Sequence, residues 1–196
     1  MNRWDRRIER AAELATRYPE AAELLSLYGL IAKFQKQIAA VKTPREALCE
    51  LLRLNAPEPL ASNPPAEFLE LVLAQAAGHT CPGIHEMPVA AVLRPEGEGA
   101  KRSLLCSLCF NEWDIGRLTC ANCGEDRESQ LQIFTAEQFS HVRIEACETC
   151  RTYIKSVDLT RDGLAVPEVD EIAGVALDLW AAERGYTKVQ SNLFGL

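Results

Sequence analysis

Apolar side chains recur every three or four positions in the first part of the chain, which is the spacing of helices with one buried face. The pattern predicts one helix over residues 5–18, which ends before Pro19, and a longer helix over residues 20–41. The apolar positions of the longer helix are Leu24, Tyr28, Ile31, Phe34, Ile38 and Val41. Such a stripe most often faces a protein core, and less often it contacts a partner.

A third predicted helix begins with a strong start signal. Thr43 and Pro44, followed by Glu46, are typical of a capped helix start, in which the Thr side chain accepts a backbone hydrogen bond and the Glu side chain reaches back. The helix pattern fades near Asn55. Residues 56–65 contain four prolines, which indicates an extended connector.

Two more helices are predicted further along the chain. The first covers residues 66–77 and ends at Gly78, because glycine readily adopts the left-handed conformation that closes a helix. The second covers residues 168–184, where Pro167 opens the helix, acidic residues crowd its first turn and Gly185 closes it.

The region between these two helices has the pattern of strands. Residues 89–93 and 103–105 lie on either side of a polar turn, and residues 131–134 and 141–144 lie on either side of another. Each of these hairpins runs into a cysteine pair, and the plan repeats with similar spacing. The chain is therefore expected to contain two tandem ribbons.

Composition places the chain among ordinary globular proteins and changes the picture mainly through charge. Its 47% hydrophobic and 25% charged residues are typical values, and the formal net charge is −7. Nucleic-acid binders usually carry a basic footprint, which this chain lacks overall. No apolar stretch approaches the ~20 residues of a membrane span, and the polar start is not expected to act as a signal peptide.

Eight cysteines are the main chemical feature of the sequence. Six of them form three Cys-x-x-Cys pairs: Cys106 with Cys109, Cys120 with Cys123, and Cys147 with Cys150. Two such pairs can surround one metal ion tetrahedrally, so a metal is favoured over disulfides, free thiols or a redox motif. In the order of the chain, Cys120, Cys123, Cys147 and Cys150 would form one complete site, called site two here.

The first ribbon would form a second, less regular site. Cys81 is followed by Ile84 where the second cysteine of a pair would stand, and His85 lies one residue further on. Imidazole is a competent zinc ligand, so site one would use Cys81, Cys106 and Cys109 with His85 as an uncertain fourth ligand. The alternative is that His85 is a loop residue and site one is incomplete. Cys49 lies on an apolar helix face and is expected to be a small core residue.

Four sequence blocks resemble the formate dehydrogenase accessory (formation) protein family, FdhE. They are TCPGIHEMPV (80–89), LCSLCFNEW (105–113), RLTCANCG (117–124) and EACETCRTYIK (145–155), and their order and spacing are more specific than any single cysteine pair. The resemblance covers roughly residues 78–196 well and the start loosely. Family members are usually longer, so the helical N-terminal region is expected to be shortened. In the family the first pair is Cys-Pro-x-Cys-Gly, and Ile84 and His85 depart from it.

The resulting expectation is an α+β protein. Residues 1–77 would form a helical region, residues 78–124 and 117–165 two rubredoxin-like or zinc-ribbon modules, and residues 166–196 a C-terminal helix and tail. The resemblance implies a cytoplasmic, non-enzymatic assembly factor that binds the catalytic subunit of a formate dehydrogenase. It would carry one or two ions, described as iron in the family, although the same thiolate tetrahedron takes zinc.

Partner contacts and two other functions remain open from the residues alone. Trp113, between two cysteine pairs, is either a contact residue or part of the small core, and Glu112 and Arg117 would be either a surface ion pair or partner contacts. The residues also leave open that the chain forms a homo-oligomer.

One alternative function is a rubredoxin-like iron electron carrier. The other is a zinc-ribbon nucleic-acid binder, which would use the cations Lys101, Arg102, Arg117, Arg127, Arg143 and Arg151.

Overall fold

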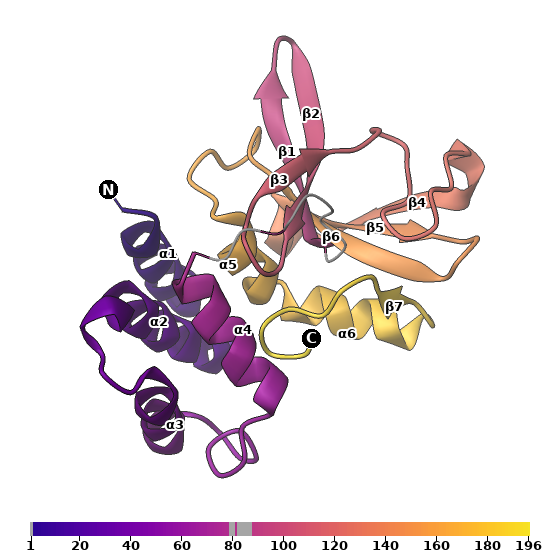
Figure 1. Ribbon diagram of the computed structural model, residues 1–196. Coiled ribbons are helices and arrows are strands. Elements are labelled where there is room, and N and C mark those ends of the chain that lie inside the picture. Colours follow the sequence, from indigo (N-terminus) through magenta and orange to yellow (C-terminus); the bar gives the residue numbers. More distant parts are fainter. Residues whose placement is uncertain (1, 79–80, 82–87) are drawn as a thin grey trace.

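The N-terminal part of the molecule is a helical layer beside a β-sheet (Figure 1). The computed structural model describes residues 2–78, 81 and 88–196. The helices of this layer are α1 (Arg3–Arg17), α2 (Ala22–Gln37), α3 (Pro44–Asn55) and α4 (Ala66–Ala76), with 3-10 turns at Pro19–Ala21 and Ile38–Ala40. Helices α2, α3 and α4 share a small core that includes Ile31, Leu48, Leu52 and Val72. The predicted helices therefore form, with their apolar faces inward.

The start of α3 differs in detail from the prediction. Pro44 is its first helical residue, but the side chain of Thr43 makes no capping hydrogen bond. The Thr43 backbone has φ −124° and ψ 76°, whereas the N-cap of α1, Asn2, has the extended value ψ 152° and accepts a hydrogen bond from the Trp4 N–H at 3.2 Å. The capping interaction predicted at Thr43 is therefore wrong, because the backbone holds its hydroxyl away from the helix end.

The two predicted ribbons belong to one mixed sheet. Strand order in this seven-stranded sheet is β3-β2-β1-β6-β5-β4, with β7 beside β6. The strands are β1 (Pro88–Glu96), β2 (Gly99–Cys106), β3 (Glu112–Asp114), β4 (Leu131–Thr135), β5 (Val142–Cys147), β6 (Thr152–Asp158) and β7 (Thr187–Lys188), with 3-10 turns at Glu128–Gln130 and Glu137–Phe139. Hairpins β1–β2 and β4–β5 are the predicted ones.

The hairpins join along a parallel seam between β1 and β6. The seam contains the pairs Ala91 with Ser156, Val92 with Val157 and Leu93 with Asp158. Strand β6 is antiparallel to β5 on its other side, so it links the two ribbons. The sequence pattern did not predict β3, β6 or β7, and it did not predict that the ribbons form a continuous sheet.

The predicted C-terminal helix is divided in two. Helix α5 (Pro167–Ala173) and helix α6 (Val175–Glu183) meet at Gly174, whose φ −81° and ψ 29° interrupt the helix. A side chain at Gly174 would lie 3.5 Å from the Glu171 carbonyl oxygen and 3.6 Å from Cδ of Lys155, so the chain passes close to the sheet there. In Figure 1, α5 and α6 lie between the N-terminal helices and the sheet.

The largest core lies where these layers meet. It brings together Leu14 from α1, Leu25 from α2, Ile144 from β5, Val157 from β6 and Ile172 from α5, all essentially inaccessible to solvent. Helices from both ends of the chain therefore share this core with strands β5 and β6. Within the described part of the chain, no helix combines the length and the apolar character that crossing a membrane requires.

Candidate metal centres

Site two gathers four thiols at the open end of the second hairpin. Cys120 and Cys123 lie in the loop before β4, Cys147 ends β5, and Cys150 lies just before β6. Their sulfur atoms all lie within 4.8 Å of one another. The Sγ–Sγ distances are 3.7 Å between Cys120 and Cys150 and 3.8 Å between Cys123 and Cys147.

The thiol spacing fits a single tetrahedral ion. A metal–sulfur bond of about 2.3 Å implies about 3.8 Å between neighbouring sulfurs of a tetrahedron. The two Sγ–Sγ distances given above match this value, and the other sulfurs lie within 4.8 Å of one another, so these four cysteines could hold one metal ion. An all-thiolate tetrahedron suits zinc or iron.

The local backbone explains why the thiols converge. The residue after the second cysteine of each pair has a positive φ: Phe110 at 57°, Gly124 at 76° and Arg151 at 56°. This left-handed residue turns the chain back, and the Gly124 N–H donates to the Cys120 carbonyl at 3.1 Å. Asn122 N–H points at the Cys120 sulfur at 3.4 Å. Each pair is therefore a tight knuckle whose N–H groups face the sulfur.

The four thiols of site two differ in acidity. Burial disfavours the Cys150 thiolate, but hydrogen bonds from Thr152, whose hydroxyl lies 3.0 Å away, and from Asn122 outweigh it and lower its pKa to about 6. For Cys123, a backbone hydrogen bond lowers the pKa, but burial and the neighbouring thiols raise it to about 12. Since a metal binds thiolates, binding at site two would release protons.

Site one brings three thiols together at the base of the first hairpin. Cys81, Cys106 and Cys109 have their sulfurs within 4.8 Å of one another, and the Cys81 and Cys106 sulfurs are 3.5 Å apart. Burial and the two neighbouring thiols raise the pKa of Cys81 to about 12. This three-sulfur set could hold an ion with one further ligand. His85, the predicted fourth ligand, lies outside the described residues.

Two of the predicted contact residues, Glu112 and Trp113, lie on β3. The third, Arg117, lines a groove together with Cys120 and Cys147 of site two. Trp113 on β3 is paired with Leu104 and is half-buried against a small core that includes Ile154. Glu112 does not pair with Arg117. Its carboxylate binds Arg94 at 2.5 Å and accepts a hydrogen bond from the Ser103 hydroxyl at 2.6 Å. This happens because β3 pairs with β2, which places Glu112 beside Ser103 on β2 and Arg94 on β1.

A buried ion cluster beneath the sheet was missed by the sequence pattern. Lys155 on β6 is fully buried, and its Nζ lies 2.8 Å from Glu171 and 2.5 Å from Asp178. Lys188 also binds Glu171, and the Tyr153 hydroxyl donates to Asp178 at 2.8 Å. Burial opposes ionisation of Glu171, but the two lysines outweigh it and lower its pKa to about 2. The cluster holds α5 and α6 to the sheet.

A second buried cluster joins α1 to α5. His141, Asp162 and Asp170 have ligand atoms within 4.8 Å of one another, which would suit a metal. However, Arg10 Nη2 lies 2.5 Å from both Asp162 and Asp170, so a guanidinium already supplies the positive charge. Burial lowers the pKa of Arg10, but the two carboxylates outweigh it and raise that pKa. This cluster is therefore a network of ion pairs that joins α1 to α5, two helices that are far apart in the sequence.

Comparison with known proteins agrees with this geometry. Residues 118–194 match the family "FdhE, C-terminal domain", and they include all four cysteines of site two. This segment is similar to the C-terminal domain of FdhE proteins. The similarity to the FdhE family that the sequence blocks indicated is thereby confirmed.

Relatives and a solved structure extend the similarity beyond this domain. A protein FdhE homolog from Aquifex aeolicus is 40% identical over 116 residues, which are 59% of this chain and 41% of that protein. One from Haemophilus influenzae (strain PittGG) is 32% identical over 117 residues, 59% of this chain and 38% of that protein. The matched segment thus spans well under half of these relatives. The chain is also similar in structure to the crystal structure of the FdhE protein from Pseudomonas aeruginosa. The match covers 98% of this chain and 96% of that chain, with a TM-score of 0.68 and 23% sequence identity, so the fold is shared.

Proposed function

We propose that this chain is a cytoplasmic, non-enzymatic accessory factor for the assembly of formate dehydrogenase and that it binds the catalytic subunit of that enzyme. The observation that carries the proposal is the similarity of residues 118–194 to the FdhE C-terminal domain, with the four thiols of site two inside this segment. The motif blocks around Cys81 and Cys106, which lie before that domain, support the same family role.

The metal ions in this proposal are structural. Cys120, Cys123, Cys147 and Cys150 hold one ion of zinc or iron, and Cys81, Cys106 and Cys109 hold a second with His85. A bound ion at site two would cross-link the loop that carries Cys120 and Cys123 to the end of β5 and the turn that follows it. Small β modules have little core of their own, so metal-binding free energy contributes directly to their folding.

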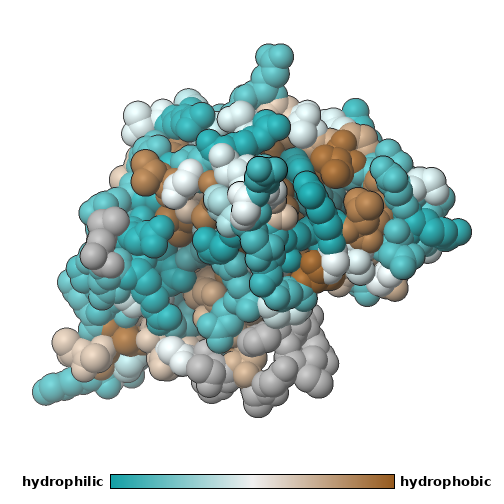
Figure 2. Space-filling model, turned by 90° about the horizontal axis from the view of Figure 1, so that it is seen from above, coloured by the Kyte–Doolittle hydropathy of each residue, from teal (hydrophilic) through white to brown (hydrophobic). Residues whose placement is uncertain are grey.

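The surface proposed for the client surrounds Trp113 and the knuckles. Leu118 and Ile133 are 45% and 51% exposed, and they line one groove with Arg117, Cys120 and Cys147. Figure 2 shows hydrophobic patches among hydrophilic surface on the side where β4 and β5 lie. Because the knuckles fix these loops, docking would lose little conformational entropy. The N-terminal helices would form a second contact, and the complex would be transient so that the finished client is released.

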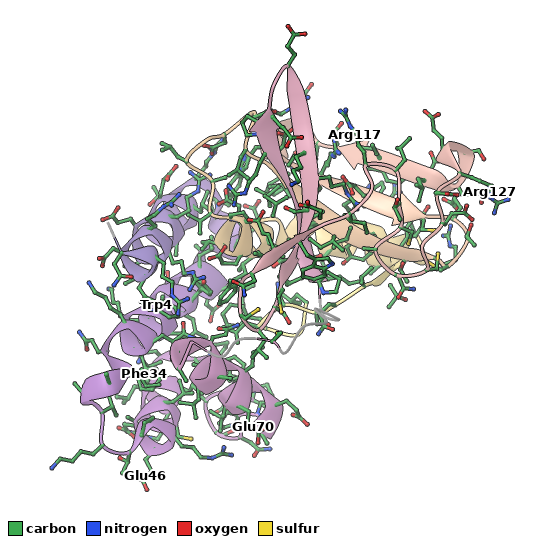
Figure 3. The ribbon with its side chains drawn as sticks, turned by 45° about the horizontal axis from the view of Figure 1, so that its top comes forward. Trp4, Phe34, Glu46, Glu70, Arg117 and Arg127 are labelled. Carbon is green, nitrogen blue, oxygen red and sulfur yellow. The ribbon has the colours of Figure 1, made fainter. Side chains whose placement is uncertain are left out.

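The charge pattern argues against the nucleic-acid alternative. Five of the six cations that it would use form ion pairs with neighbouring carboxylates, namely Lys101, Arg102, Arg127, Arg143 and Arg151. Paired cations neutralise few phosphates. The labelled side chains of Arg117 and Arg127, both in the segment between β3 and β4, lie apart and point outward in Figure 3. The electron-carrier alternative would instead require iron in site two and a visible absorption band that bleaches reversibly with reductant.

A pull-down with the unassembled catalytic subunit tests the proposal. Ile133→Asp should abolish capture because it places a charge in the apolar groove, and the exposure of Ile133 should let the variant fold. Leu164→Asp, at a side chain that is 78% exposed elsewhere, is the matched control and should capture normally. The proposal is wrong if no complex forms and a strain lacking this protein has normal formate dehydrogenase activity. Equal capture by both variants would instead remove the groove from the interface.

A further inference from the structure

A pocket rich in arginine lies between the start of α1, the knuckle after β2 and the start of α5. We call it the arginine pocket and define it by Arg3, Arg6, Arg7 and Arg94, with Phe110 and Glu168 also in its lining. The first three arginines lie on the first two turns of α1, beside Trp4, which is labelled in Figure 3. The pocket does not overlap the apolar groove near site two.

The arginine pocket is positively charged within an acidic protein. Its lining holds four arginines and two glutamates, Glu112 and Glu168, so its formal charge is +2, against −7 for the whole chain. The glutamates are already used, because Glu168 binds Arg7 and Glu112 binds Arg94, each at 2.5 Å. Among the described residues, no carboxylate lies within ion-pair distance of Arg3 or Arg6. Two positive charges therefore remain without a counter-ion among the residues that the structure describes.

Arg7 is held rigidly at the base of this pocket. Its residue is only 3% exposed, and its guanidinium lies 4.1 Å from the ring centre of Phe110 and 4.6 Å from that of Trp4. Its Nε donates to Glu168, yet its Nη1 has no hydrogen-bond partner among the residues that the structure describes. Leaving a buried charged donor unpaired is costly. The Arg7 guanidinium is thus held in position before any ligand binds, and its Nη1 donor is unused.

We propose that the arginine pocket binds the phosphate group of a small phosphate monoester or of inorganic phosphate. A phosphate carries nearly two negative charges at neutral pH and offers three acceptor oxygens, which match the two unpaired arginines and the unused donor of Arg7. Planar guanidinium groups bind phosphate in a bidentate manner, and they do so best when they are already oriented. The proposal does not depend on the client that the protein binds.

Isothermal titration of the full-length protein with inorganic phosphate at constant ionic strength tests this assignment. Wild type should bind one phosphate per chain. Arg6→Ala should weaken binding about tenfold or more, because it removes a charged hydrogen-bond donor at an exposed position. Arg53→Ala removes the same charge from the exposed face of α3 and should bind like wild type. Arg7→Lys keeps the positive charge but removes the planar guanidinium group, so it should also weaken phosphate binding.

Glycerol phosphate and succinate, compared with inorganic phosphate, show which kind of anion the pocket prefers. Glycerol phosphate should bind at least as well as inorganic phosphate if a monoester is the natural ligand, and weaker binding would leave free phosphate as the source. Succinate carries the same charge on carboxylates and should bind less tightly than both. The proposal is overturned if phosphate does not bind, if Arg6→Ala and Arg53→Ala bind it equally, or if succinate binds more tightly than either phosphate.

Discussion

The two hairpins share a sequence plan but differ in what supports them. The second hairpin and β6 place Phe139, Ile144 and Val157 in the largest core, beneath α1, α2, α5 and α6. The first hairpin has a small core around Val92 and Leu105, and its tip projects from the molecule (Figure 1). A repeated motif therefore does not imply a repeated energetic role. The second module carries the global fold, whereas the first is a local unit attached to it.

The largest effect is expected at site two. Cys147→Ser should lower the free energy of unfolding by about 5 kcal/mol or more, because a lost ligand removes metal-binding energy in the part that carries the core. The midpoint of thermal unfolding should fall by roughly 10 °C or more. Calorimetry and elemental analysis measure both effects, with Cys49→Ser as the control cysteine. A variant with wild-type stability and metal content would show that site two is not structural.

The next largest effect is expected at the buried ion cluster. Lys155→Ala leaves Glu171 and Asp178 beside only Lys188, and removing one partner of a buried charge cluster costs about 3–5 kcal/mol. Lys101→Ala, which breaks a surface pair with Asp114, should change the free energy of unfolding far less, because solvent screens that pair. Urea unfolding compares the two variants. Similar losses would mean that the cluster does not hold the C-terminal helices to the sheet.

Acid should weaken the same cluster. The Glu171 pKa is about 2 in the folded protein against 4.5 ordinarily, so its stabilising contribution is complete above pH 4.5 and is lost as the pH falls toward 2. Glu171→Gln should therefore show a shallower fall in the free energy of unfolding over this range. Metal release affects both proteins alike, so their difference isolates Glu171. Parallel curves for the two proteins would contradict the assigned pKa.

The smallest effect on global stability is expected at site one. Cys106→Ser or His85→Ala should reduce the metal content from two ions to one per chain, while the unfolding midpoint moves by only a few degrees, about 1 kcal/mol. A three-sulfur, one-imidazole set also favours zinc over rubredoxin-type iron. If wild type contains one ion and His85→Ala does not change that number, the protein has a single site. A loss of stability as large as that of Cys147→Ser would remove the distinction between the hairpins.

Local patterns predicted much of the fold and the grouping of the thiols that could hold metal ions. Cysteine spacing and alternating strands identified the knuckles and both hairpins because these features arise within short segments. The seam between Ala91 and Ser156 could not be predicted, since it joins residues far apart in sequence. Lys155 and Glu171 look like surface charges in sequence, because only tertiary packing buries them as a pair.

The parallel seam between β1 and β6 has a consequence for how the molecule opens. Only three residue pairs join the hairpins there, whereas β5 and β6 are joined along six. Non-local pairing forms late in folding, and weakly joined segments separate as cooperative units. Amide hydrogen exchange should therefore show residues 88–106 exchanging together, well before the amides of β5 and β6. In a cell, opening of this seam would make the extended chain of β1 and β2 accessible to proteases.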